Sequence, residues 1–216
     1  KKIIEFTDGP EWTFKDLKIK SLRKARILKN LNLKAGDSLT VIIEDPKEFI
    51  LYWIASNFLG VIFVALNTAV KGKGLLHQIN TSKSKHVIVD NLFFDEVNDL
   101  KNNNKLDVEI LNCSELKNKE IINENEVIFG KLSDNVCTMF TSGTSGPSKG
   151  VMMPNAHCVL FAIGTIENYD LKHDHVFYIS LPLFHANGLF MQLLACIITG
   201  AKAIIRNRFS ASNWLK

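Results

Sequence analysis

Residues 49–66 read FILYWIASNFLGVIFVAL, a run of 18 residues without a charged side chain. That length is sufficient for a membrane-spanning helix. The flanking residues favour two shorter elements instead, because Asp45 is a preferred helix cap, Pro46 suits the first helical position and Gly60 suits a helix end. Residues 61–66 are rich in β-formers. We therefore predict a helix followed by a buried strand, each too short to cross a bilayer, and no membrane span.

Outside this run the apolar pattern continues to alternate between helix and strand. Thr13 with Asp16 three residues later marks the start of another helix. Residues 91–131 contain Asn-rich stretches, which we interpret as a surface connection carrying little chemistry. Strands that alternate with helices predict an α/β fold, with layered, largely parallel sheets and flanking helices. Besides the helix and strand already described, we predict helices at residues 13–31, 75–81 and 188–199 and one that begins at residue 155. Strands are predicted at residues 39–43, 86–90 and 136–140, and two more begin at residues 176 and 201.

The composition excludes several classes of protein. The chain has 216 residues, 46% hydrophobic and 22% charged, which is enough to form a core without disulfides or metal. Its net charge is +4, but the lysines are scattered and form no continuous basic stripe, so we expect no nucleic-acid partner.

Four cysteines stand far apart, with no CxxC pair, which argues against a zinc site and a disulfide scaffold. The first residue is Lys, and no signal-peptide pattern follows it. We expect a cytoplasmic protein.

The segment that carries chemistry follows the strand ending at Phe140. Residues 141–150 read TSGTSGPSKG, with five hydroxyls, three glycines and one lysine. Glycines bring backbone amides close to a ligand, and amides, hydroxyls and an ammonium suit a polyphosphate, whose oxygens only accept hydrogen bonds. The alternative is an ordinary flexible loop. The GxxxxGK[ST] pattern of common ATPases does not match, because Ser148 stands five residues after Gly143.

Residues 140–151, FTSGTSGPSKGV, resemble the phosphate-loop motif [YF]TSGTTGxPKGV of the adenylate-forming superfamily. That superfamily includes acyl-CoA synthetases, firefly luciferase and the adenylation domains of peptide synthetases. Ser145 replaces a Thr, and Pro147-Ser148 stands where x-Pro is commoner. Residues 12–17, 36–37, 60–67 and 181–188 (LPLFHANG) are similar to further family segments. Residues 184–185 and 209–214 resemble the acyl-CoA ligase branch, with the crotonobetaine/carnitine-CoA ligase type nearest.

The resemblance implies roles for individual residues. The backbone and hydroxyls of the loop would bind the β- and γ-phosphates of ATP, Thr141 would help to place Mg²⁺ with a Glu beyond residue 216, and Lys149 would stabilise the departing pyrophosphate. His185 would lie beside the acyl carboxylate and the α-phosphate, although a lone His near Phe184 and Leu189 is also typical of a core residue. The nucleotide-binding set is Thr141, Ser142, Gly143, Thr144, Ser145, Gly146 and Lys149, and the catalytic set is His185 and Lys149.

The implied reaction activates a carboxylic acid with ATP to an acyl-adenylate, which a thiol, that of CoA, then attacks. Residues 1–216 would form the N-terminal portion of the large domain, and the family's later motifs are absent, so we expect this piece alone to be inactive. Whether the protein forms a homo-oligomer stays open. The alternatives are a peptide-synthetase adenylation domain, a luciferase-like oxygenase, or a truncated nucleotide-binding chain without turnover.

Overall fold

The computed structural model describes residues 1–104, 106–142 and 146–206, and these residues divide between two compact units. The central unit consists of residues 19–155, and the terminal unit consists of residues 1–18 and 156–216. Helix α1 (Phe14–Asn30) runs from the terminal into the central unit.

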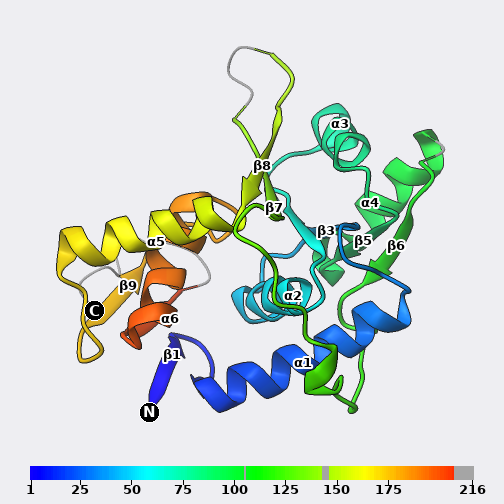
Figure 1. Cartoon of the computed structure of the whole chain (residues 1–216). Helices are drawn as coiled ribbons and strands as arrows, with labels where there is room; N and C mark the ends of the chain where they lie inside the picture. Colours follow the sequence, from blue (N-terminus) through cyan, green and yellow to red (C-terminus); the bar gives the residue numbers. More distant parts are fainter. Residues whose placement is uncertain (105, 143–145, 207–216) are drawn as a thin grey trace. The chain divides into compact units, whose positions relative to one another are not determined.

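The central unit is built on a sheet in which the described strands follow the order β6-β5-β3-β4-β7-β8 (Figure 1). Neighbouring strands run parallel from β6 to β7, and only β8 at the edge is antiparallel to its neighbour. Helices connect β3 to β4, β4 to β5 and β5 to β6, because parallel strands need a long crossover connection. The strands are β3 (Ser38–Ile42), β4 (Ile62–Ala65), β5 (His86–Val89), β6 (Glu109–Asn112), β7 (Asn135–Phe140) and β8 (Gly150–Pro154).

Alternate residues of these strands bury opposite faces of the sheet. On one face, Val64 and Val87 join a cluster of buried side chains from α3 (Gly72–Ser82) and α4 (Asn91–Asn104). On the other face, the fully buried Phe63 ring meets the ring of Phe49 on α2 (Pro46–Phe58) edge to face, with centroids 5.1 Å apart. A sheet covered on both faces explains why its central strands are continuously apolar.

The helix and strand predicted within residues 49–66 are confirmed as α2 and β4. The Asp45 side chain caps α2 by accepting a hydrogen bond from the Lys47 backbone N–H at 3.0 Å. Gly60 has a φ of +66°, a conformation that glycine adopts without steric cost. Among the described helices, none combines the length and the apolar character that a membrane crossing requires. The Thr13–Asp16 start of α1 is also confirmed, since the Asp16 N–H donates to Thr13 Oγ1 at 3.2 Å.

The interpretation of residues 91–131 as a surface connection was wrong in part. They contain α4, β6 and a short 3₁₀ turn, η1 (Glu124–Glu126). In α4 only Phe93 and Val97 are buried, so its apolar stripe is too narrow to stand out from its Asn residues. Strand β6 is the sheet edge, where burial imposes little alternation on the sequence.

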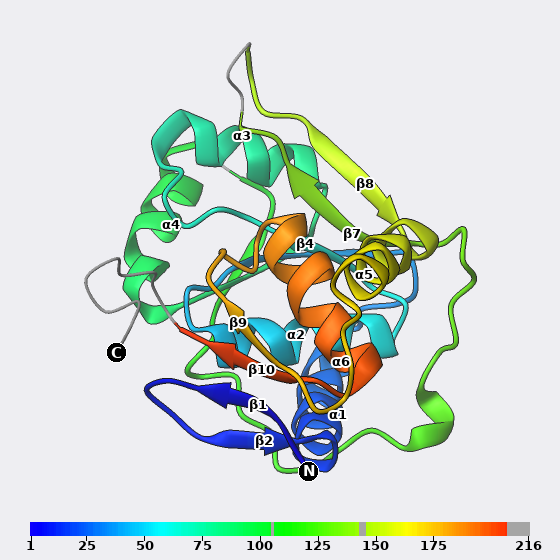
Figure 2. The same cartoon turned by 90° about the vertical axis from the view of Figure 1, so that its left-hand side faces the viewer.

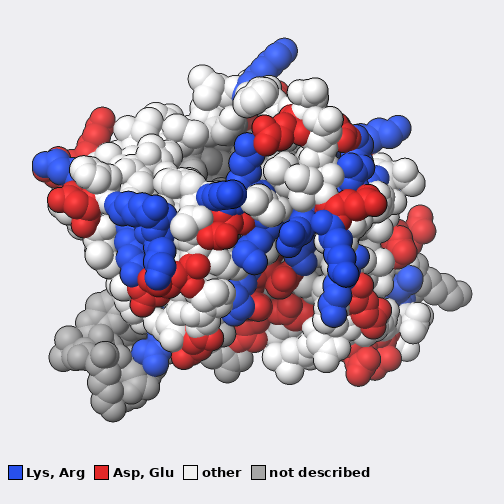
Figure 3. Space-filling view, turned by 90° about the horizontal axis from the view of Figure 1, so that it is seen from below, with Lys and Arg blue, Asp and Glu red and all other residues white. Residues whose placement is uncertain are grey.

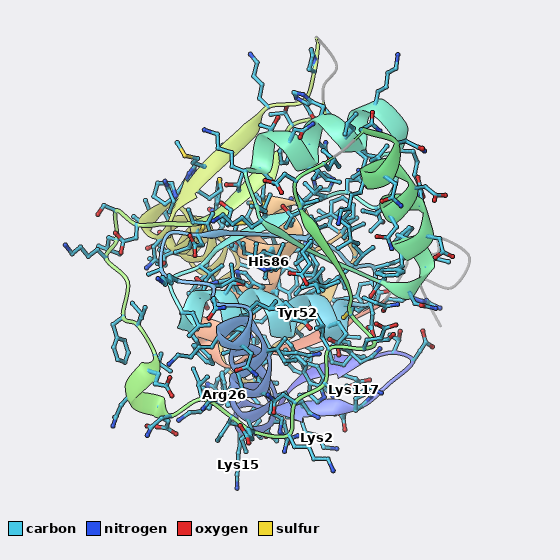
Figure 4. The ribbon with its side chains drawn as sticks, turned by 90° about the vertical axis from the view of Figure 1, so that its right-hand side faces the viewer. Lys2, Lys15, Arg26, Tyr52, His86 and Lys117 are labelled. Atoms are coloured by element: carbon cyan, nitrogen blue, oxygen red, sulfur yellow. The ribbon has the colours of Figure 1, made fainter. Side chains whose placement is uncertain are left out.

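Basic residues of helix α1 contact other segments of the central unit, in addition to the apolar side chains that the helix buries. Lys24 Nζ lies 2.5 Å from Glu48 Oε2 and 4.7 Å from the centroid of the Tyr52 ring. Tyr52 is fully buried and lies on α2 (Figure 4). Arg26 donates to the Ile121 carbonyl at 3.0 Å, and Lys29 pairs with Glu126. Lys24 and Lys29 are thus each paired with a glutamate of the same unit.

Charges of both signs are interspersed on the protein face seen in Figure 3, where Asp and Glu lie between Lys and Arg. Such mixing gives no long single-sign stripe on that face. The expectation of no nucleic-acid partner stays a prediction.

The terminal unit contains a second sheet, whose described strands follow the order β2-β1-β10-β9 (Figure 2). Strand β1 pairs in parallel with β10, and β10 pairs in parallel with β9. Lys202 on β10 forms ion pairs with Glu5 on β1 and, at 3.0 Å, with Glu11 on β2. The strands are β1 (Lys2–Phe6), β2 (Glu11–Thr13), β9 (Val176–Ile179) and β10 (Lys202–Ile205).

Helices complete the terminal unit where the sequence predicted them. Helix α5 (Asn155–Tyr169) begins at the predicted residue. Residues 187–199 form the helix predicted between the last two strands, but as an unusual π-helix, η2 (Asn187–Leu194), followed by α6 (Ala195–Thr199). The predicted α/β fold with largely parallel sheets and flanking helices is therefore confirmed.

Candidate functional site

The predicted phosphate loop connects β7 to β8, and the two strands form an antiparallel hairpin at the edge of the central sheet (Figures 1 and 2). Phe140 is paired with Gly150 at the last step before the loop. A Cβ placed on Gly150 would lie 3.1 Å from Thr138 Cγ2 and 3.5 Å from the Phe140 ring. Glycine at this position therefore lets the two arms approach closely.

Two hydrogen bonds between Thr141 and Lys149 close the loop. The Thr141 N–H donates to the Lys149 carbonyl at 3.0 Å, and the Lys149 N–H donates to Thr141 Oγ1 at 3.0 Å. Both residues are exposed, as is Ser142 beside them. The hairpin thus brings together the hydroxyl and the lysine that the sequence assigned to phosphate and metal binding.

The backbone conformation at residue 146 in the loop favours glycine. Gly146 has a φ of +149°, which residues with a side chain rarely adopt. It is exposed, so its backbone is open to a ligand. The other predicted residues of the loop, Gly143, Thr144 and Ser145, lie outside the described residues.

The described part of the loop suits a polyphosphate but supplies little for a metal ion. The Lys149 ammonium is a donor only, and the Thr141 hydroxyl keeps a lone pair and a proton after accepting the Lys149 N–H. A hydroxyl oxygen is a suitable ligand for Mg²⁺, which usually keeps several waters and binds substrate phosphates. No cluster of three or more His, Cys, Asp or Glu suited to a metal occurs among the described residues. A magnesium ion near Thr141 stays a prediction.

Helix α3 contacts the second arm of the hairpin, a feature that the sequence analysis missed. His77 Nε2 lies 2.8 Å from the Ser148 carbonyl oxygen, and Gln78 Nε2 donates to Ser148 Oγ at 3.0 Å. Both views of the ribbon show α3 beside the hairpin (Figures 1 and 2). The departure from the family motif at Ser148 was the one sequence signal that could have directed attention to a partner for this hydroxyl.

His185, the other predicted catalytic residue, belongs to the terminal unit. The His185 backbone N–H donates to the Pro182 carbonyl at 3.1 Å, and the His185 backbone carbonyl accepts from the Leu189 N–H at 3.0 Å. The chain therefore turns tightly at His185. The ring stands tilted against Phe184, with centroids 4.6 Å apart. Partial desolvation lowers the pKa of the His185 imidazole below its ordinary value. The neutral ring is therefore favoured near pH 7, which leaves one nitrogen free to accept a hydrogen bond.

Gly188 permits this turn. A Cβ at that position would lie 2.5 Å from the Pro182 carbonyl oxygen and 2.7 Å from that of Leu181, which is too close for any side chain. The π-helix that starts here places Asn187 and Gln192 five residues apart on one turn, and Gln192 Nε2 donates to Asn187 Oδ1 at 3.1 Å. π-helical turns occur frequently at functional sites.

The described part of the loop is exposed and lies on a β-hairpin at the edge of a largely parallel α/β sheet, as the resemblance to adenylate-forming proteins leads one to expect of a phosphate loop. The sequence pattern of the family described as "AMP-binding enzyme" matches residues 1–216. The chain belongs to this family, as the resemblance of its motifs predicted.

Individual relatives are distant but similar over almost the whole chain. The 2-succinylbenzoate–CoA ligase of Bacillus licheniformis is 29% identical over 204 residues, which cover 94% of this chain and 41% of the relative. Long-chain fatty acid transport protein 6 of Mus musculus is 24% identical over 229 residues, which cover 99% of this chain and 37% of the relative. The chain thus spans about two fifths of the length of these curated relatives.

The fold agrees with that of a solved relative. The structure of o-succinylbenzoate coenzyme A synthetase from Bacillus subtilis, in complex with ATP and magnesium ion, matches with a TM-score of 0.85 and 26% identity. The match covers 99% of this chain and 56% of that chain.

Proposed function

We propose that this chain is the part of an acyl-CoA ligase that binds the phosphates of ATP and activates a carboxylic acid. In the first half of the reaction, the carboxylate attacks the α-phosphate, which yields an acyl-adenylate and pyrophosphate. In the second half, the CoA thiol attacks the acyl carbon and AMP leaves. As in other phosphoryl-type transfers, the protein contributes positioning and charge stabilisation.

The observation that carries this proposal is the pairing of Thr141 with Lys149 across the mouth of the loop. Thr141 carries a hydroxyl and Lys149 an ammonium, both residues are exposed, and the chain belongs to the AMP-binding enzyme family. Lys149 would stabilise the charge that develops on pyrophosphate as it departs. Mg²⁺, which is bound with ATP in the solved relative, would neutralise phosphate charge from beside Thr141.

The remaining predicted residues complete this proposal. Ser142, Gly143, Thr144, Ser145 and Gly146 would bind the β- and γ-phosphates with Thr141 and Lys149. His185, neutral at pH 7 as its lowered pKa favours, would donate a hydrogen bond from its one ring N–H to the acyl carboxylate. Residues 1–216 would be the N-terminal portion of the large domain, with the rest of the site supplied by other parts of the protein. CoA as the thiol is supported by the names of two relatives, which are CoA ligases.

Acid-dependent exchange of pyrophosphate into ATP tests the proposal. The full-length protein containing this chain should catalyse exchange with at least one member of a panel of aliphatic and aromatic acids, and should form the CoA thioester when CoA is added. Lys149→Ala should slow exchange by about 30- to 1000-fold, because losing one contact to a developing charge raises the barrier by roughly 2–4 kcal/mol.

Lys131→Ala is the matched control. Lys131 is an exposed lysine on the same unit, before β7, and its backbone N–H rather than its ammonium makes the described contact with Asp134. This control should exchange at the wild-type rate. Equal rates for Lys149→Ala and Lys131→Ala would remove Lys149 from the mechanism, and absence of exchange with every acid in the wild type would refute the ligase assignment.

A further inference from the structure

The contact between helix α3 and the hairpin joins a fixed element to the residue next to Lys149. Leu75 and Ile79 on α3 are buried in the central core, so the helix is held firmly against the sheet. His77 and Gln78 lie between these two anchoring residues in the sequence and reach Ser148. We call the set of His77, Gln78 and Ser148 the α3 anchor.

Both bonds of the α3 anchor converge on a single residue from different directions. A carbonyl oxygen only accepts, so we assign the proton of the His77 ring to Nε2, which donates to Ser148 O. Gln78 Nε2 donates to the hydroxyl of the same residue. Ser148 is thereby held through its backbone and its side chain at once, directly before Lys149.

Gln78 is a costly residue to bury without a specific purpose. Gln78 is only 4% exposed, and its Oε1 has no hydrogen-bond partner within the part of the chain that the structure describes. Burying an amide is unfavourable unless its groups are paired. Leucine would fill the same space at the helix–sheet boundary, so the amide is explained by its bond to Ser148 and not by packing.

Ser148 also stands where the family motif that this loop resembles has proline. Proline would restrict φ to about −65° and so stiffen the arm that carries the lysine. Serine leaves that dihedral free, which adds conformational freedom that phosphate binding would have to remove. The two bonds from α3 restrict the same residue by another route.

We propose that His77 and Gln78 are positioning residues for the phosphate loop, which hold Lys149 in its working place through Ser148. This inference rests on the proposed function for its catalytic consequence, since it assumes that the loop binds ATP. The anchor itself is a property of the protein without ligand. The anchoring of Ser148 and its consequence for catalysis can therefore be tested separately.

The first experiment measures hydrogen exchange at the Thr141 and Lys149 amides in the full-length protein without nucleotide. Both amides are bonded across the mouth of the loop. Gln78→Leu should accelerate their exchange about fivefold, the factor that corresponds to losing one ordinary hydrogen bond. Asn80→Leu removes an exposed amide from the same helix and should leave both rates unchanged.

The second experiment is a double-mutant cycle that combines Gln78→Leu with Ser148→Ala. The Ser148→Ala substitution removes the hydroxyl and keeps the carbonyl that His77 contacts. Each single variant should raise the KM for ATP about fivefold with little change in kcat, and the double variant should be no worse than either single one. Ser148→Thr keeps a hydroxyl and should restore much of the affinity that Ser148→Ala loses. A general loss of stability would produce none of these patterns.

Two results would overturn the inference. Unchanged exchange at Lys149 in Gln78→Leu would show that α3 does not hold the hairpin, and additive effects in the cycle would show that Gln78 does not act through Ser148. A wild-type protein without pyrophosphate exchange would contradict the proposed function alone, because accelerated amide exchange in Gln78→Leu would still support the anchor.

Discussion

The turn that carries His185 depends on one glycine, and its replacement gives a sharp test of the terminal unit. In Gly188→Ala the new methyl would lie 2.5 and 2.7 Å from two carbonyl oxygens. An ordinary contact begins near 3.4 Å, so the backbone at Pro182 would have to move by about 0.9 Å. Carbonyl oxygens of the main chain cannot rotate away as the end of a flexible side chain can.

The expected size of this effect follows from what is known of overpacked sites. Forcing extra atoms into a filled space costs about 1–3 kcal/mol. Alanine in place of glycine in a helix returns about 0.5–1 kcal/mol, which offsets part of that cost. We expect Gly188→Ala to lower the free energy of unfolding by about 1 kcal/mol, the difference between these two contributions.

Gly164→Ala provides the matched comparison. Gly164 lies in α5 of the same unit, and a Cβ there would have no neighbour within 4 Å. This substitution should stabilise the protein by about 0.5–1 kcal/mol, so the two glycine variants should shift in opposite directions. Urea denaturation followed by circular dichroism measures both. If Gly188→Ala proves as stable as Gly164→Ala, the close approach of the backbone at Pro182 is not what requires glycine at this position.

Two further predictions concern single side chains. Burial raises the pKa of the Asp90 carboxyl, although this carboxyl accepts backbone N–H bonds from Glu44 at 2.6 Å and Asp45 at 3.1 Å. The native state therefore favours the protonated carboxyl, and the stability that protonated Asp90 contributes is lost as the pH rises through the raised pKa. Asp90→Asn should gain stability relative to wild type between pH 4 and pH 7 in thermal melts, and a constant difference across this range would contradict the desolvation argument. His185→Ala should raise the KM for the acid by about tenfold or more and leave that for pyrophosphate nearly unchanged, because a hydrogen bond to a charged group is lost only at the acyl end. A variant with a lower melting temperature and unaltered kinetics would identify His185 as a core residue instead.

Local rules were enough to predict elements whose signals lie within a few residues. The Asp45 cap, Pro46 and Gly60 together separated α2 from β4 in an 18-residue apolar run. Their effects on the backbone are intrinsic to the residues, so neighbouring strands do not change the result. The family motif at residues 140–151 was recognised for the same reason, since its residues are consecutive, and its role in phosphate binding stays a prediction.

The sequence could not predict features that arise from contacts between distant segments. Strand β8 received no assignment, because the pairing of Gly150 with Phe140 depends on the loop folding back and not on the apolar pattern of the residues. The bonds of His77 and Gln78 to Ser148 join residues about 70 positions apart. The π-helical form of η2 was likewise missed, because apolar spacing predicts a helix but does not distinguish a π-helix from an α-helix.

The pairing of β1 with β10 has a consequence for how the protein is made. Residues 2–6 are translated well before their parallel partner, residues 202–205. At typical rates of synthesis the interval is about 10–40 s. During that time only the neighbouring β2 can pair with β1, and a two-stranded hairpin is marginally stable by itself. The central unit, whose residues end at 155, is fully translated before β10 exists. The nascent chain must therefore keep this apolar strand available until β10 closes the sheet.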